Sequence, residues 1–143
     1  MSDRHLTRTA VFVILKRGNK IFFLRRANTG WADGLLNIPA GHVDKGDQPR
    51  EAAIKEAKEE ACVDIEIADL EFVHADFLRD EYSNYYFRAK KWRGEPAVGE
   101  PHLSSEAVWI DEDNLPDDVT PQLKNMFEQI RKGSYYSEIE RTI

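Results

Sequence analysis

The chain has 143 residues, of which 41% are hydrophobic and 32% charged, and it carries a formal net charge of -6. These values fit one globular domain over residues 1–143 and exclude a disordered chain. The acidic balance disfavours nucleic-acid polymers as partners, because binding them requires a basic surface. A small phosphorylated ligand remains compatible with it, since a divalent cation held by surplus carboxylates supplies positive charge locally.

The sequence shows no segment for insertion into a membrane. No run approaches the ~20 apolar residues of a membrane span, and the first residues lack the apolar stretch of a signal peptide, so we expect a cytoplasmic protein. Cys62 is the single cysteine. One cysteine excludes an internal disulfide and a cysteine-based zinc site within one chain, and we expect Cys62 to be a small buried residue.

The first half of the chain predicts a hairpin, a loop and a helix. The runs 9–15 and 20–25 are rich in β-branched and aromatic residues and flank the turn residues 16–19, which is typical of a hairpin. Turn residues then concentrate in 28–37 and predict a loop that leads into a strand end. The segment 49–61 has proline at its first position and alanines throughout, which predicts a helix.

The second half predicts three strands and a second helix. Strand-like runs occupy 65–74, 82–92 and 107–110, and apolar residues at helical spacing occupy 120–132, where Gly133 ends the pattern. The tail 134–143 predicts no element. The order of elements therefore indicates an α/β fold with a mixed sheet between helices.

Three glutamates in the predicted helix suggest a metal site. Glu56, Glu59 and Glu60 stand at i, i+3 and i+4, so we expect their carboxylates to converge on one face. Like charges at this spacing destabilise a helix by roughly 0.2–0.5 kcal/mol per pair, and oxygen ligands suit magnesium or manganese. The alternative is a solvated helix in which Lys55 and Lys58 pair with the glutamates and nothing is bound.

A family pattern includes these glutamates. The Nudix signature reads Gly-x5-Glu-x7-Arg-Glu-U-x-Glu-Glu-x-Gly-U, where U is apolar, and this sequence resembles it in Gly41-x5-Asp47-x7-Lys55-Glu56-Ala57-x-Glu59-Glu60-x-Cys62-Val63. The spacing matches at every position. The resemblance implies a Nudix α/β/α sandwich with a central mixed β-sheet, and the elements predicted above fit that order.

Three positions depart from the signature. Asp47 keeps a carboxylate on a shorter stem, and Lys55 keeps a positive charge without the bidentate fork of arginine. Cys62 replaces a glycine that commonly takes a left-handed backbone conformation after a helix. Because cysteine tolerates that conformation poorly, we expect the helix to continue one residue further.

The resemblance also implies roles for particular residues. Glu56, Glu59 and Glu60 would bind Mg2+, or alternatively Mn2+, together with the backbone carbonyl of Ala40, and Glu56 or Glu60 would also orient the attacking water. Glu100 stands where some nucleoside-triphosphatase members carry a further metal-binding or base glutamate.

Two arginines at the end of the second predicted strand, Arg25 and Arg26, are candidates for binding phosphate, because a guanidinium matches phosphate oxygens. The equally weighted alternative is that either one is a solvent-exposed arginine without such a role. Five aromatic residues could stack on a base, although aromatic residues in strands more often lie in the core. These residues are Trp31, Tyr82, Tyr85, Phe87 and Trp109.

The resemblance implies a Mg2+-dependent hydrolase that cleaves a phosphoanhydride in a nucleoside diphosphate derivative. The expected substrate is a nucleoside triphosphate, which is converted to the monophosphate and pyrophosphate. We expect the enzyme to be a monomer or homodimer. Members that hydrolyse oxidised guanine nucleotides recognise the base partly through an asparagine just before the last helix. This chain has Val119-Thr120 there, so that substrate is not assigned.

Two other classes of function compete with the hydrolase. A non-catalytic Nudix-like domain would bind a nucleotide or a partner without cleavage, and metal-dependent turnover discriminates against it. A structural subunit would use the acidic helix to bind a basic surface, and an effect of magnesium on stability or turnover discriminates against that.

Overall fold

The computed structural model describes residues 3–140, in which eight strands, two α-helices and a short 3-10 helix follow one another. In chain order they are β1 (Arg8–Arg17), β2 (Lys20–Arg26), β3 (Leu36–Asn37), β4 (Ala40–His42), α1 (Pro49–Ala61), η1 (Ile67–Asp69), β5 (Glu71–Leu78), β6 (Tyr82–Ala89), β7 (Ser104–Asp111), α2 (Pro121–Arg131) and β8 (Tyr136–Ile139). The predicted hairpin and both predicted helices are confirmed.

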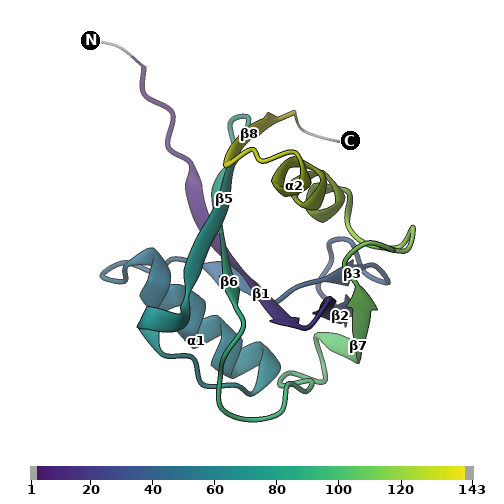
Figure 1. Ribbon diagram of the computed structural model, residues 1–143. Coiled ribbons are helices and arrows are strands. Elements are labelled where there is room, and N and C mark those ends of the chain that lie inside the picture. Colours follow the sequence, from purple (N-terminus) through teal and green to yellow (C-terminus); the bar gives the residue numbers. More distant parts are fainter. Residues whose placement is uncertain (1–2, 141–143) are drawn as a thin grey trace.

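The strands form a mixed sheet with the order β3-β2-β1-β6-β5-β8, in which β4 also pairs with β1 and β7 with β2. The pairs β1–β6 and β5–β8 are parallel, and the other pairs are antiparallel. Figure 1 shows α1 and α2 on opposite sides of the strands. The predicted α/β sandwich with a central mixed sheet is therefore confirmed.

Strand alternation builds a separate core on each side of the sheet. Val11, Val13 and Leu15 of β1 pack in the cluster that contains the α1 alanines. Phe12 and Ile14 face the other way and pack in the cluster that contains the buried residues of α2. Because successive strand side chains point to opposite faces, one strand serves both cores.

Small side chains let α1 approach the sheet closely. Its buried residues are all alanines, Ala52, Ala53, Ala57 and Ala61. Its start is fixed by Pro49 at the first turn and by a hydrogen bond from the Gln48 backbone N–H to the Glu51 carboxylate at 2.8 Å. The helix is therefore held at a defined depth and register against the sheet.

Two strand predictions and one omission need correction. The first part of the strand predicted at 65–74 is wrong, because the chain forms η1 before β5 begins at Glu71. The strand predicted at 82–92 ends at Ala89. The tail was given no element, yet it contains β8, which pairs with β5.

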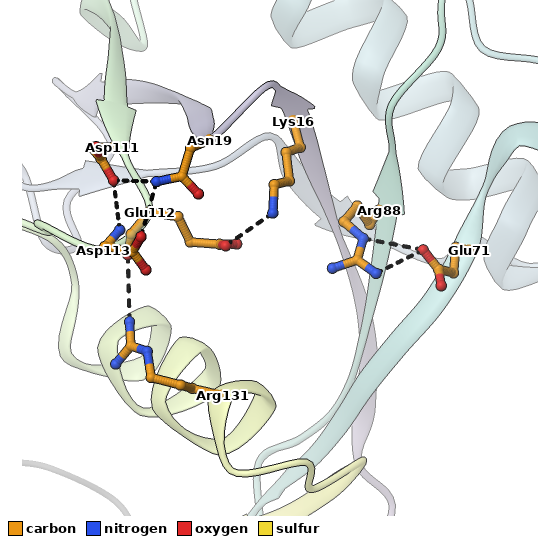
Figure 2. A network of polar contacts seen from close by, with 8 residues as sticks. All are labelled: Lys16, Asn19, Glu71, Arg88, Asp111, Glu112, Asp113 and Arg131. Carbon is orange, nitrogen blue, oxygen red and sulfur yellow. Dashed lines mark hydrogen bonds and ion pairs between the residues drawn. The ribbon is translucent and has the colours of Figure 1, made fainter.

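A network of polar contacts ties the β1–β2 turn to the end of β7 (Figure 2). Lys16 forms an ion pair with Glu112 at 3.0 Å, and the Asn19 amide donates to Asp111 at 2.6 Å. Arg131 of α2 donates to the Glu112 backbone carbonyl at 3.5 Å. The acidic residues Asp111 and Glu112 are therefore engaged in contacts within the fold.

Candidate active site

The glutamates of α1 lie beside the strand that precedes the helix. Glu60 accepts a hydrogen bond from the Ala40 backbone N–H, and the N–O distance is 3.0 Å. Glu56 lies against Gly41, because a Cβ added to Gly41 would be 2.1 Å from the Glu56 carboxyl carbon. The side-chain-free surface of Gly41 therefore makes room for the Glu56 carboxylate, which explains a glycine at this position.

The loop that follows β6 brings Glu100 to the same place. The Gly99 N–H donates to the Glu60 backbone carbonyl at 2.9 Å, and the Ala97 N–H donates to the Ala61 carbonyl at 3.0 Å. A Cβ on Gly99 would be 2.1 Å from the Glu59 carbonyl oxygen. This loop caps the C-terminal carbonyls of α1 and places Glu100 next to the helix carboxylates.

The carboxylates of Glu56, Glu60 and Glu100 interact electrostatically. Burial, together with the charges of Glu59 and Glu100, raises the pKa of Glu56 to about 7. Burial also raises the pKa of Glu60 to about 8, with smaller contributions from Glu56 and Glu100, against the opposing hydrogen bond from Ala40. Burial and neighbouring carboxylates thus raise the pKa of two glutamates at one place, which is typical of a functional site.

The prediction placed the three carboxylates on one face of α1, and in residues 3–140 their oxygens do not meet at a single point. Within residues 3–140, no three His, Cys, Asp or Glu side chains lie close enough to hold one ion. Glu60 is directed to the Ala40 N–H, Glu56 lies on Gly41, and Glu59 is exposed. The helix spacing sets a shared face, but side-chain rotamers decide whether the carboxylate oxygens meet.

The alternative in which lysines neutralise the glutamates does not match the ion pairs of α1. Lys55 binds Asp47 at 2.7 Å, and Lys58 binds Asp64 at 3.2 Å. The two departures Asp47 and Lys55 thus contact each other. Asp47, with a shorter side chain than the glutamate of the signature, thus pairs with Lys55, whose single ammonium stands in place of the arginine guanidinium.

The two candidate phosphate-binding arginines have different surroundings. Arg25 donates to the Gly34 carbonyl and to Asp118, both at 2.8 Å, and binds Glu106 at 3.1 Å. These contacts join β2 to β7 and to the segment before α2. The structure does not bring Arg25 together with the helix carboxylates.

Arg26 lies on the carboxylate side. Burial lowers its pKa, and the charges of Glu60 and Asp33 oppose that effect. Its Nε donates to the Trp31 carbonyl at 2.8 Å, and its guanidinium lies 4.9 Å from the centre of the Trp31 ring. Arg26 is thus the arginine that the fold places near Glu60.

The end of α1 differs from the expectation. The helix does not continue past Ala61, and Cys62 adopts the left-handed conformation, with φ 63° and ψ 28°. Its N–H donates to the Lys58 carbonyl at 3.2 Å. Cys62 is also exposed rather than buried, so both expectations for this residue were wrong.

The aromatic candidates mostly belong to the core, as favoured from the sequence. Phe87 is buried, and Tyr82, Tyr85 and Trp109 pack against the two core clusters. Trp31 differs, because 56% of its surface is exposed. It is the one of the five with a broadly accessible ring.

Two surface hollows lie away from the carboxylates. One, of about 670 Å³, is bordered by His42, Asp44 and Tyr85, and the second, of about 450 Å³, by Phe72 and Tyr85. The His42 ring forms a hydrogen bond with the Tyr82 hydroxyl at 2.8 Å. Neither hollow brings a glutamate of α1 to its lining, so neither supplies the site.

Gly99 was missed by the sequence reasoning. Gly99 packs against Glu59 of α1, which is far away in the sequence, and no local sequence pattern predicts such a contact. The turn Gly94-Glu95-Pro96 was the one available signal that the chain changes direction after β6.

Comparisons with known proteins agree with this fold. The model of the NUDIX domain family matches residues 6–130. The 8-oxo-dGTP diphosphatase of Escherichia coli (strain K12) is 27% identical over 110 residues, which are 75% of this chain and 85% of that protein. The methanol dehydrogenase activator of Bacillus methanolicus is 26% identical over 135 residues, which are 93% of this chain and 67% of that protein.

A solved structure of a MutT NUDIX hydrolase from Burkholderia pseudomallei has a TM-score of 0.78 with 22% identity, and the match covers 87% of this chain and 98% of that chain. The family match and the curated relatives define the class of this protein as a Nudix pyrophosphohydrolase. The chain belongs to the NUDIX domain family and is a MutT-like Nudix hydrolase. No helix within residues 3–140 has the length and apolar character needed to cross a membrane.

Proposed function

We propose that this enzyme hydrolyses a nucleoside triphosphate to the monophosphate and pyrophosphate in a Mg2+-dependent reaction, in which Mn2+ is able to replace Mg2+. The observation that carries the proposal is the grouping of Glu56, Glu60 and Glu100 beside Ala40-Gly41. The substrate is a small nucleotide, and we infer a cytoplasmic monomer or homodimer. The net charge of -6 supports the exclusion of nucleic-acid polymers.

The donor set fits a hard divalent cation. Glu56, Glu59, Glu60 and the Ala40 carbonyl offer only oxygen ligands, which Mg2+ and Mn2+ prefer. The exposed Glu59 side chain is free to change rotamer toward its neighbours. When bound, the ion supplies Lewis-acid stabilisation of phosphate charge and lowers the pKa of water.

The residues of the chain itself perform the remaining work. Glu56 or Glu60 orients the attacking water and accepts its proton as a general base. Glu100 adds a further carboxylate for metal or water. Arg26 binds phosphate oxygens, whereas Arg25 is engaged by Asp118 and Glu106 and is not carried into the proposal.

The comparisons support a nucleotide substrate but do not fix the base for this chain. One relative is named as an 8-oxo-dGTP diphosphatase and the other as a methanol dehydrogenase activator. The segment before α2 contains Val119-Thr120 and no asparagine. We therefore keep the proposal at the level of a nucleoside triphosphate.

Product analysis on a panel of nucleoside triphosphates, nucleotide sugars and dinucleoside polyphosphates, with Mg2+ or with a chelator, tests the proposal, and the expected products are the monophosphate and pyrophosphate from a triphosphate. Glu60→Gln should lower kcat at least about a hundredfold, because it removes a proton acceptor and a ligand. Arg26→Met should also lower kcat/KM, whereas Arg88→Met, at the remote pair with Glu71, should not. Full Mg2+-dependent turnover by Glu60→Gln would contradict the role of Glu60, and no turnover by the wild type would favour a binding domain.

A further inference from the structure

The two faces of the sheet are covered unequally at the edge formed by β5 and β8. On one face, α2 packs on both of these strands, whereas on the other face α1 packs mainly on β1, β4 and η1. Figure 1 shows α2 beside β8 and α1 remote from it. The side of β5 and β8 that faces away from α2 is therefore left without a covering helix.

The strand register assigns side chains to this uncovered side. Tyr85 of β6 lies opposite Ala75 of β5 and packs against the core that contains the α1 alanines, so Ala75 points away from α2. Side chains two residues apart in a strand, and aligned side chains of neighbouring strands, share a face. The set that we call the bare face consists of Phe72, Ala75 and Phe77 of β5 together with Tyr136 and Glu138 of β8.

Large apolar side chains are exposed on the bare face and beside it. Phe72, Phe77 and Tyr136 are each between 38% and 53% exposed, and so is Ile67 of η1, at 54%, which borders the same hollow as Phe72. An aromatic side chain offers roughly 150–250 Å², so the exposed parts of these four residues total on the order of 400 Å². An apolar patch of this size on a soluble domain commonly marks an interaction surface.

The two ends of the bare face differ in shape. At one end, Phe72 and Phe87 border the hollow of about 450 Å³. At the other end, Phe77 and Tyr136 expose their aromatic rings. A two-fold axis normal to the face near Ala75 would place the exposed rings of one copy over the hollow of a second copy. The face is thus complementary to itself, as an isologous dimer requires.

The two ends also carry opposite charges. The Arg50 guanidinium lies at the hollow end, 5.1 Å from the centre of the Phe87 ring, and forms no ion pair within residues 3–140. Glu138 is exposed at the other end, where it accepts a hydrogen bond from the Tyr136 hydroxyl at 2.7 Å. The same two-fold rotation brings Arg50 of one copy toward Glu138 of the other. This charge pattern favours a second copy, because a uniformly acidic or basic partner would meet a like charge at one end.

We propose that the bare face is the interface of a homodimer, in which two copies of the chain pack this face together about a two-fold axis. The exposed apolar area is about half of the roughly 800 Å² that each partner contributes to a standard interface, and the polar groups around it supply the rest. This inference goes beyond the proposed function and does not depend on the proposed reaction. Its test therefore requires no substrate.

Sedimentation equilibrium of the full chain over a range of micromolar concentrations measures the dissociation constant of the dimer. Phe77→Glu should raise this constant at least about tenfold, because it places a charge against the apolar hollow of the partner. Trp31→Glu is the matched control. It changes an equally exposed aromatic residue near β3, at the opposite end of the strand order from β8, and should leave the dissociation constant unchanged.

Charge reversal tests the two-fold arrangement itself. Arg50→Glu and Glu138→Arg should each raise the dissociation constant at least about fivefold, because the contact occurs twice in the dimer. The double variant exchanges the two charges and should return the constant to near the wild-type value. A folding defect would not produce this result, since the effects of two distant changes on folding add instead of cancelling.

Two results would overturn the proposal. One is a wild-type protein that stays monomeric over the whole concentration range, which would leave the bare face to a different protein partner. The other is a dimer whose dissociation constant responds neither to Phe77→Glu nor to the two charge reversals, which would place the interface elsewhere on the chain. Circular dichroism and urea denaturation verify that each variant is folded.

Discussion

Cys62 shows how one residue can carry a local conflict within an otherwise regular helix end. The residue after α1 takes a positive φ so that the N–H of the next residue, Val63, reaches back to the Ala57 carbonyl at 3.5 Å and Val63 becomes buried. For a residue with a Cβ atom, this conformation costs roughly 1–2 kcal/mol. The requirement comes from the capping geometry, so the chain keeps the conformation even though the residue disfavours it.

Replacing Cys62 with glycine should therefore stabilise the protein. Cys62→Gly removes the steric cost at φ 63°, and part of that gain is offset by the greater freedom of glycine in the unfolded chain, which leaves about 0.5–1 kcal/mol. Urea denaturation measures the free energy of unfolding. Cys62→Ala keeps a Cβ and is the control, and equal stability of the two variants would show that the left-handed conformation carries no strain.

At the scale of elements, local patterns predicted what local interactions determine. The bounds of α1 follow from Pro49 and the alanine spacing, and the sequence gives them correctly. β8 was missed because it is an edge strand positioned from far along the chain. Its register depends on pairing with β5 and on His74, which bonds to the Ser134 carbonyl at 3.0 Å and the Ser137 hydroxyl at 2.8 Å.

The candidate site divides in the same way. The shared face of Glu56 and Glu60 could be predicted from helical spacing, since it is a property of the helix alone. The hydrogen bond between Glu60 and Ala40, and the different partners of Arg25 and Arg26, depend on how elements pack. No spacing rule contains that information.

The contact between the Gly99 loop and α1 leads to a prediction for Gly99→Ala. The new Cβ would be 2.1 Å from the Glu59 carbonyl oxygen, so the loop must move and its hydrogen bond to the Glu60 carbonyl must weaken. We expect a loss of about 1–3 kcal/mol in the free energy of unfolding and a fall in kcat/KM at conditions where the variant is folded.

Gly133→Ala is the matched control for Gly99→Ala. Gly133 has a positive φ of 81° but open space around its Cα, so this substitution should destabilise through the backbone alone and leave kcat/KM unchanged. Urea denaturation and steady-state kinetics on both variants make the comparison. Unchanged kinetics in a folded Gly99→Ala variant would mean that the position of Glu100 does not matter to turnover.

At the scale of the whole molecule, the free energy of unfolding depends on pH through the glutamates of the candidate active site. Glu56 and Glu60 have pKa values of about 7 and about 8 in the folded protein, against 4.5 for an unperturbed glutamate. Between pH 4.5 and pH 8, the folded chain thus retains protons that the unfolded chain has released. The free energy of unfolding must fall as pH rises through this window, because stability decreases wherever the folded state binds more protons.

Without metal, stability should therefore be higher at pH about 5 than at pH about 8, by an amount of the order of a few kcal/mol, and Mg2+ should reverse much of the loss at the higher pH. Mg2+ favours the charged carboxylates of the folded state, so it opposes the protonation that burial promotes. Urea denaturation in chelator and in millimolar Mg2+ measures both effects.

Glu60→Gln resembles the protonated acid, so it should flatten the decline of the free energy of unfolding with pH and weaken the response of that free energy to Mg2+. Asp117→Asn, which removes an exposed carboxylate before α2, should change neither. A Glu60→Gln profile parallel to that of the wild type would show that Glu60 is not the group through which pH and metal act on stability.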